Sequence, residues 1–153
     1  MTAKEKALDN LDWKILTELQ KNARVSASEI GRRVGLTAPA VAKRIARMEE
    51  SGFILGYRTT MDYDKLGLSV RVFLQFKSTS LKHDDMVKVV DAMPQIQEWY
   101  TVTGENCMLL KVAVATTKDL EIILAQLGKY GGTNTSIILS GNVKPRIVGK
   151  NRN

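Results

Sequence analysis

Apolar residues between positions 9 and 52 recur every three or four residues, in three short stretches separated by polar residues or glycine. This spacing predicts three helices. A side chain that can cap a helix precedes each stretch, and residues that favour a helix end follow the second and third stretches. Ser26 and Glu29 have the spacing of a capping box. The predicted starts are Asp9, Ser26 and Thr37, and the predicted ends are Gly35, Ser51 and Gly52.

The second half of the chain alternates between strand and helix patterns. Positions 70–77 alternate apolar and polar side chains with a period of two, as a strand does. The predicted order is a strand at 70–77, a helix at 83–93, strands at 96–103 and 108–115, a helix at 118–129 and a strand at 133–140. This β-α-β-β-α-β order is that of a ferredoxin-like domain. Phe53–Asp62 has no helix signal, and its Ile54, Tyr57, Thr59 and Thr60 predict an extended strand.

The charge is distributed unevenly along the chain. The net charge of +7 arises from +4 in residues 1–60, −1 in residues 61–140 and +4 in residues 141–153. The shift near residue 60 supports two domains: a helical domain over 1–60 that ends in a strand linker, and a βαββαβ domain over 61–153 that includes a basic tail. A basic domain beside a neutral one suggests a polyanionic partner for the first.

The composition excludes several classes of protein. One cysteine and one histidine cannot form an internal disulfide or a structural zinc site, and they leave few catalytic arrangements based on a histidine. No apolar run approaches the ~20 residues of a membrane helix. The first residues lack the apolar core of a signal peptide. We therefore expect a soluble cytoplasmic protein without metal or cofactor, and not an enzyme.

The third predicted helix has two different faces. Val41, Ile45 and Met48 form an inward stripe, while small residues and then cations remain outside. Small residues allow a close approach to a DNA groove, and cations contact phosphates or bases. A solvated basic face is the alternative interpretation. The expected DNA-binding residues, which include the N-termini of the second and third helices, are Ser26, Ser28, Arg33, Thr37, Ala38, Pro39, Ala40, Lys43, Arg44 and Arg47.

The pattern over residues 8–54 resembles the DNA-binding domain of the Lrp/AsnC family of feast/famine regulators. The matching residues are Leu8-Asp9, Asp12, Ile15-Leu16, Glu29-Ile30-Gly31, Val34-Gly35-Leu36, Arg44-Ile45 and Gly52-Phe53-Ile54. The second half is similar to the regulatory domain of that family, so the resemblance covers about residues 8–143. It implies an α+β protein with an N-terminal (winged) helix-turn-helix domain followed by a ferredoxin-like βαββαβ regulatory domain. It also implies a homodimer and higher assembly, commonly octamers.

The turn at residues 101–107 is the candidate small-molecule site. It combines a glycine, free backbone N–H groups and short polar side chains, although an ordinary hairpin turn would look the same. The resemblance implies that an amino acid binds around this turn, between regulatory domains, beside the last strand. Where many family members continue Gly-Asp-x-Asp, Cys107 replaces the second acid. The expected effector-binding residues are Tyr100, Thr101, Thr103, Gly104, Glu105, Asn106, Cys107, Thr135 and Ser136.

These observations predict a sequence-specific transcription regulator that binds double-stranded DNA. Its assembly or its DNA affinity would respond to a small molecule, an amino acid by the resemblance. An architectural, nucleoid-type DNA-binding protein without an effector is the alternative. The central predicted strand at 108–115 lacks the aromatic residues that an RNA-recognition module uses for base stacking, and no nucleophile–base pair is visible.

Overall fold

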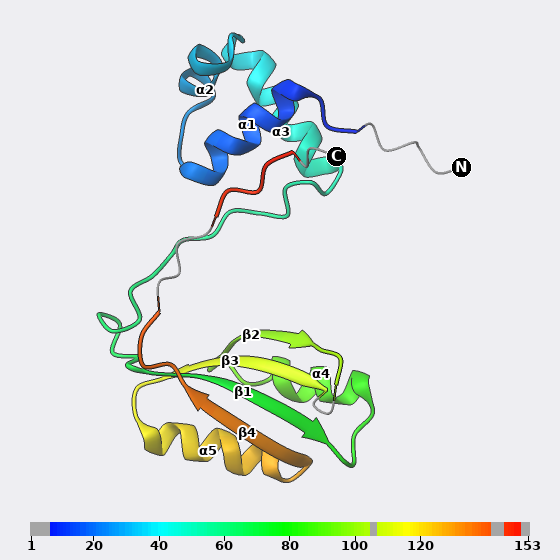
Figure 1. Cartoon of the computed structure of the whole chain (residues 1–153), viewed down its shortest axis with the longest axis vertical. Coiled ribbons are helices and arrows are strands. Elements are labelled where there is room, and N and C mark those ends of the chain that lie inside the picture. Colours follow the sequence, from blue (N-terminus) through cyan, green and yellow to red (C-terminus); the bar gives the residue numbers. More distant parts are fainter. Residues whose placement is uncertain (1–6, 105–106, 142–145, 151–153) are drawn as a thin grey trace. The chain divides into compact units, whose positions relative to one another are not determined.

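The computed structural model describes residues 7–104, 107–141 and 146–150, and these residues form two compact units. The first unit is the chain up to Thr59 together with residues 146–150 of the tail. The second unit is residues 60–141 (Figure 1). The tail therefore packs with the first unit, although the sequence pattern groups it with the second.

The first unit contains the three predicted helices, α1 (Asn10–Lys21), α2 (Ala27–Val34) and α3 (Ala38–Glu50). Asp9 and Asp12 form a capping box at α1, and the hydroxyls of Ser26 and Thr37 accept backbone N–H bonds at the starts of α2 and α3. At Ser26 this is a simple cap, because Glu29 pairs with Arg33 instead. Gly35 ends α2 with φ +76°, in the left-handed region that favours glycine. The fully buried apolar core is Ile15, Ile30, Val41 and Met48.

The predicted strand at Phe53–Asp62 is wrong. These residues form no strand. The segment stays attached to α3 at two points: the N–H of Ile54 donates to the carbonyl of Met48 at 3.0 Å, and the hydroxyl of Tyr57 donates to Glu49 at 2.9 Å. The β-branched and aromatic residues favour an extended chain, but a strand also needs a neighbour. The described residues offer no strand that pairs with this segment.

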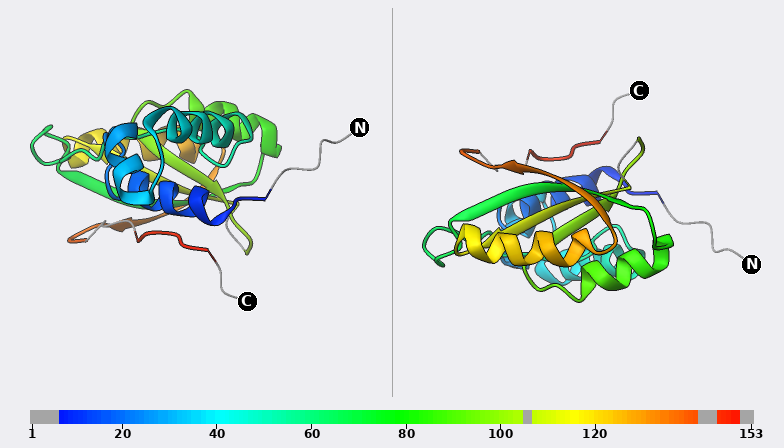
Figure 2. Two further views of the ribbon diagram at one scale, coloured as in Figure 1. Left: turned by 90° about the horizontal axis from the view of Figure 1, so that it is seen from above. Right: turned by 90° about the horizontal axis from the view of Figure 1, so that it is seen from below.

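The second unit has the predicted βαββαβ order. Its elements are β1 (Val70–Ser78), α4 (His83–Asp91), β2 (Ile96–Thr101), β3 (Met108–Val114), α5 (Thr117–Gly128) and β4 (Gly131–Ile137). The four strands form one antiparallel sheet in the order β2-β3-β1-β4, so β2 and β4 are the edges. Both helices cover the same face of this sheet (Figure 2).

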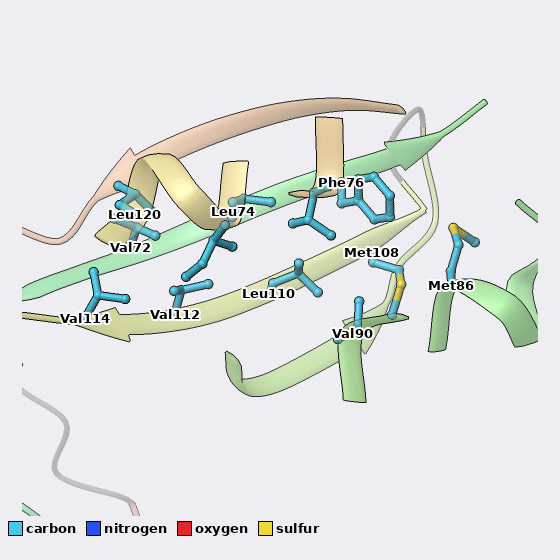
Figure 3. Packing of buried hydrophobic residues seen from close by; sticks show 12 residues of the cluster. Val72, Leu74, Phe76, Met86, Val90, Met108, Leu110, Val112, Val114 and Leu120 are labelled. Atoms are coloured by element: carbon cyan, nitrogen blue, oxygen red, sulfur yellow. The ribbon is translucent and has the colours of Figure 1, made fainter. Parts of the chain in front are cut away.

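The alternation of side chains along the strands separates a core face from an open face. Val72, Leu74 and Phe76 of β1 point toward the helices, where they meet side chains of β3, α4 and α5 (Figure 3). The intervening residues of β1 point to the open face, and Phe73 remains 41% exposed there. No helix of the described residues is long and apolar enough to cross a membrane.

Two glycines permit close approaches between backbones. A Cβ atom on Gly31 would overlap the carbonyl oxygen of Leu36, at the turn that leads from α2 to α3. A Cβ atom on Gly131 would overlap the carbonyl oxygen of Lys77 and lie 2.8 Å from the Cα atom of Ser78, where β4 begins beside β1. Neither glycine has a positive φ. The requirement for glycine at both positions is therefore steric and not conformational.

Candidate functional site

The third helix presents an exposed stripe of small residues and one cation. Pro39, Ala42, Lys43 and Ala46 are exposed at helical spacing, and Thr37 is exposed at the N-terminal cap. Ala38 and Ala40 are half-buried. This face can approach a flat or grooved surface closely, because all of its side chains except Lys43 are small.

Two predicted DNA-binding arginines are held by carboxylates of α1 and its cap. Arg44 donates from Nη1 to Asp12 and to Asp9, at 2.7 Å in both cases, and Arg47 donates from Nη2 to Asp12. The Asp12 side chain is fully buried, while those of Arg44 and Arg47 are 25% and 38% exposed. The hydrogen bonds to Asp9 and Asp12 raise the pKa of Arg44 above its ordinary value. This cluster of Asp9, Asp12, Arg44 and Arg47, here called the α1–α3 ion cluster, fixes the orientation of α3 on α1.

The two remaining predicted cations, Arg33 and Lys43, differ in whether a carboxylate pairs with them. Arg33 of α2 pairs with Glu18 of α1 and with Glu29 of its own helix. Lys43 is exposed, and the structure records no carboxylate partner for it among the described residues. Lys43 is therefore the predicted DNA-binding cation that has no competing anion within the described parts of the chain.

The ion cluster makes the first unit sensitive to acid. The hydrogen bond from Arg44 lowers the pKa of Asp9 from 3.8 to about 2. A lowered pKa contributes stability above the unfolded value and loses it as the pH falls toward the folded value. We expect the stability advantage of the wild type over Asp9→Asn to disappear between pH 3.8 and about pH 2. Urea midpoints followed by Trp13 fluorescence, in a Trp99→Phe background, would measure this advantage. An advantage that persists at pH 2 would contradict the assignment, and Glu50→Gln, at an exposed carboxylate, is the control.

The helix starts of α2 and α3 complete the candidate DNA-binding surface. The hydroxyls of Ser26 and Thr37 cap their helices, by accepting from the N–H groups of Glu29 at 3.2 Å and of Ala40 at 3.4 Å. Ser28 is exposed in the first turn of α2. Helix N-termini attract anions through their partial positive charge. Both termini therefore suit phosphate groups, although their capping hydroxyls already serve the backbone.

The candidate effector turn lies at the end of the β2–β3 hairpin. Thr101, Thr103 and Gly104 are exposed, and Gly104 has φ +111°, which favours glycine. The N–H of Val102 donates to Cys107, whose own N–H donates to Phe76 of β1. Glu105 and Asn106 lie outside the described residues. Cys107 is half-buried against the core, so its side chain packs inward.

The other predicted effector residues lie apart from this turn. Thr135 and Ser136 belong to β4, at the opposite edge of the sheet from β2. Three strand spacings of about 4.8 Å put the two edges about 14 Å apart. Thr135 also pairs with Leu74 and Ser136 with Phe73, so their side chains point to opposite faces. One chain therefore does not gather all the predicted residues into one pocket.

Tyr100 lies on the open face of the sheet. It pairs with Leu109, and its hydroxyl donates to Glu98 at 2.7 Å. Glu98 also accepts from Lys111 at 3.0 Å. Trp99 points to the other face, where its ring N–H donates to Asp91 of α4. Among the described residues, no group of three or more metal-binding side chains is placed to hold an ion.

The sequence pattern did not single out two residues of the exposed stripe, Ala42 and Ala46. Both lie one helical turn from predicted residues, Ala42 after Pro39 and Ala46 after Lys43. The helical repeat itself would have identified them, because residues three apart share a face.

Comparison with known proteins agrees with this architecture. Residues 8–49 match the AsnC-type helix-turn-helix domain, and residues 70–147 match the Lrp/AsnC ligand binding domain. The HTH-type transcriptional regulator LrpB of Bacillus subtilis is 39% identical over 124 residues, which is 81% of this chain and 83% of that protein. The structure of B. subtilis LrpC has a TM-score of 0.85 at 28% identity, covering 91% of this chain and all of that one.

A further solved structure is a transcriptional regulator from Neisseria meningitidis in complex with L-Met. Its TM-score is 0.86, and the match covers 95% of this chain and 98% of that one. The identity is 22%, so this likeness concerns the fold. The matches to the two domains of the family and to LrpB show that the chain belongs to the Lrp/AsnC family of transcriptional regulators.

Proposed function

We propose that the first unit binds double-stranded DNA through the exposed face of α3, with Lys43 as its principal cation. The observation that carries this proposal is the contrast between Lys43, exposed beside small residues, and the neighbouring Arg44, which is held in the ion cluster. Small residues allow α3 to enter a groove, and the ammonium group of Lys43 then reaches phosphates or base edges.

In this proposal the arginines of the ion cluster chiefly position α3. Arg44 and Arg47 each retain guanidinium N–H groups beyond those that bind Asp9 and Asp12, and these can contact phosphates. Ser26, Ser28 and Arg33 of α2, and Thr37, Ala38, Pro39 and Ala40 at the start of α3, form the rest of the proposed surface.

Replacing Lys43 tests the DNA-binding face. We expect Lys43→Ala to weaken operator binding by about 1–3 kcal/mol if the side chain reads a base. If it contacts only a phosphate, the loss is uniform across sequences and the salt dependence becomes less steep. Fluorescence anisotropy on DNA upstream of the protein's own gene would measure this, with a scrambled duplex as reference.

Lys118→Ala is the matched control, because it lowers the net charge equally at an exposed position of α5. Equal affinities for the two variants would show that α3 does not present Lys43 to DNA. Equal affinity of the wild type for both duplexes, at every salt concentration, would favour the architectural alternative.

We also propose that the second unit binds an amino acid at the 101–107 turn. Support comes from the family's ligand binding domain, from the exposed turn at Gly104, and from the L-Met that the N. meningitidis protein binds. Because Thr135 and Ser136 lie at the opposite sheet edge, their participation requires a second copy of the chain beside the turn. The proposed site is therefore shared between subunits.

The open face of the sheet suits a homodimer. Phe73 and Tyr100 are 41% and 51% exposed on this face, which α4 and α5 leave uncovered. Apolar surface of this kind is buried in subunit contacts. We propose a dimer through this face and, by the family resemblance, an octamer of four dimers. Light scattering after size-exclusion chromatography would give the assembly size.

Gly104 provides the test of the effector site. We expect Gly104→Val to abolish the response of DNA affinity to amino acids. A φ of +111° is sterically strained for any residue with a side chain, so the turn must change shape. Each of the twenty amino acids would be added in turn to the anisotropy assay. Gly132→Val, on a strand with open space around it, is the control. An unaltered response would remove the turn from the site.

Linkage then supplies the mechanism. An effector that binds the shared site more tightly in one assembly state favours that state and so changes DNA affinity. By linkage, DNA binding changes the affinity for the effector by the same coupling free energy. Paired DNA-binding units would read half-sites about one helical turn apart, or a multiple of it. We assign the chain no enzymatic activity, metal or cofactor, since its relatives are transcriptional regulators, and we place its action in the cytoplasm, at the nucleoid.

A further inference from the structure

A groove on the first unit lies outside the proposed DNA-binding face. It has a volume of about 500 Å³ and is lined by apolar residues of α1, including Trp13 and Leu16, and by the segment from Phe53 to Arg58. None of the predicted DNA-binding residues lines it. Among the described residues of the C-terminal tail, Val148 lines the groove.

Gln20 binds the backbone of the tail at two points. Its side-chain oxygen accepts from the N–H of Val148 at 2.8 Å, and its side-chain N–H donates to the carbonyl of Val148 at 3.0 Å. This pair of bonds imitates the exchange between two residues of adjacent strands. The amide of Gln20 thus recognises extended backbone and not a particular side chain.

A third bond sets the direction of the tail. Lys150 donates from Nζ to the side-chain oxygen of Asn10 at 3.1 Å. Asn10 begins α1 and Gln20 lies near its end, so the tail runs along α1 in the reverse direction, as the red segment in Figure 1 shows. Val148 remains 68% exposed. The hydrogen bonds, more than the burial of side chains, therefore position the tail.

We propose that this groove is a recognition site for the chain's own tail, residues 146–150, and that Gln20 is the residue that recognises it. The DNA-binding unit is then held by two segments of chain, the linker that follows α3 and the tail that follows β4. Bidentate recognition by Gln20, the apolar lining and the contact of Lys150 with Asn10 carry the proposal, independently of any effector.

Hydrogen exchange on the full-length protein tests this assignment. Gln20→Leu keeps the approximate size of the side chain but removes both bonds to Val148. We expect the Val148 amide to exchange about tenfold faster in Gln20→Leu than in the wild type. Mass spectrometry with electron-transfer fragmentation resolves this amide. Gln126→Leu, the same change at an exposed position of α5, should leave the rate unaltered.

Equal Val148 exchange in the wild type and Gln20→Leu would overturn the proposal. Trp13 fluorescence, in a Trp99→Phe background, would verify that the helical unit of the variant remains folded. A mixing experiment then tests whether the tail docks on its own chain. Gln20→Leu has an intact tail and a disabled groove, while Val148→Pro has an intact groove and a tail without the N–H donor.

The two variants would be unfolded, mixed and refolded together. If the tail binds its own chain, the Val148 amide of the Gln20→Leu protein stays unprotected in the mixture. Restored protection would show that the tail docks on a second copy, and would overturn the same-chain assignment.

Discussion

Replacing Asp12 with alanine is expected to destabilise the DNA-binding unit by about 3 kcal/mol. Asp12 is fully buried, accepts from Arg44 and Arg47, and closes the capping box with Asp9. Its loss removes a helix cap and leaves two guanidinium groups without their shared carboxylate. The cost stays below that of a wholly buried pair, because Arg44 and Arg47 are partly exposed and can gain water.

The two tryptophans allow each unit to be followed separately, since Trp13 lies in α1 and Trp99 in β2. Urea unfolding of Asp12→Ala in a Trp99→Phe background would report the first unit alone. Glu50→Ala, which removes an exposed carboxylate from the same unit, should change the midpoint little. A midpoint for Asp12→Ala equal to that of Glu50→Ala would show that the ion cluster does not hold α3.

The second large effect is expected at Gly131. Gly131→Ala should destabilise the regulatory unit by about 2–3 kcal/mol, because the new Cβ would overlap the carbonyl of Lys77. That carbonyl belongs to the backbone of β1, a central strand. Relief therefore requires β4 to move away from β1, which weakens the pairing between them.

The neighbouring glycine makes the test specific. A Cβ on Gly132 meets nothing within 4 Å, so Gly132→Ala should be nearly neutral. Urea unfolding would be followed by Trp99 fluorescence in a Trp13→Phe background. If both alanine variants unfold at the same urea concentration, the close approach of β4 to β1 is not as the structure has it.

Local chemistry made much of the fold predictable. Helix ends are set by contacts between residues that are close in sequence, as at Asp9, Ser26, Thr37 and Gly35. The types of neighbouring residues therefore predict these ends. Side-chain alternation likewise identified β1. Phe53–Asp62 shows the limit of such evidence, because a preference for extended backbone does not supply a neighbouring strand.

Contacts between distant residues were beyond the sequence pattern. Asp12 and Arg44 are 32 positions apart, and Gln20 and Val148 are 128 apart. A cation on an outer helix face looks the same in the sequence whether it meets DNA, water or a carboxylate. Only the packing of the helices shows that carboxylates pair with Arg33, Arg44 and Arg47. It also shows that Lys43 has no carboxylate partner among the described residues.

The candidate effector residues illustrate a different limit. Tyr100 and Ser136 are both polar positions of predicted strands, but the strand order places them on opposite edges of the sheet. A list of polar residues carries no information on strand order or on which face each side chain occupies. Whether such residues meet across subunits depends on assembly, which a single chain does not contain.

The docked tail has a consequence for how the protein is made. Synthesis proceeds from the N-terminus, and domains fold as they emerge from the ribosome. The three helices of the DNA-binding unit therefore emerge first. The tail, whose Val148 lines their groove, is translated only after the whole sheet of the regulatory unit. The DNA-binding unit thus begins to fold before the regulatory unit but is completed after it. A ribosome that stalls after β4 would leave the three helices able to fold, with no tail in their groove.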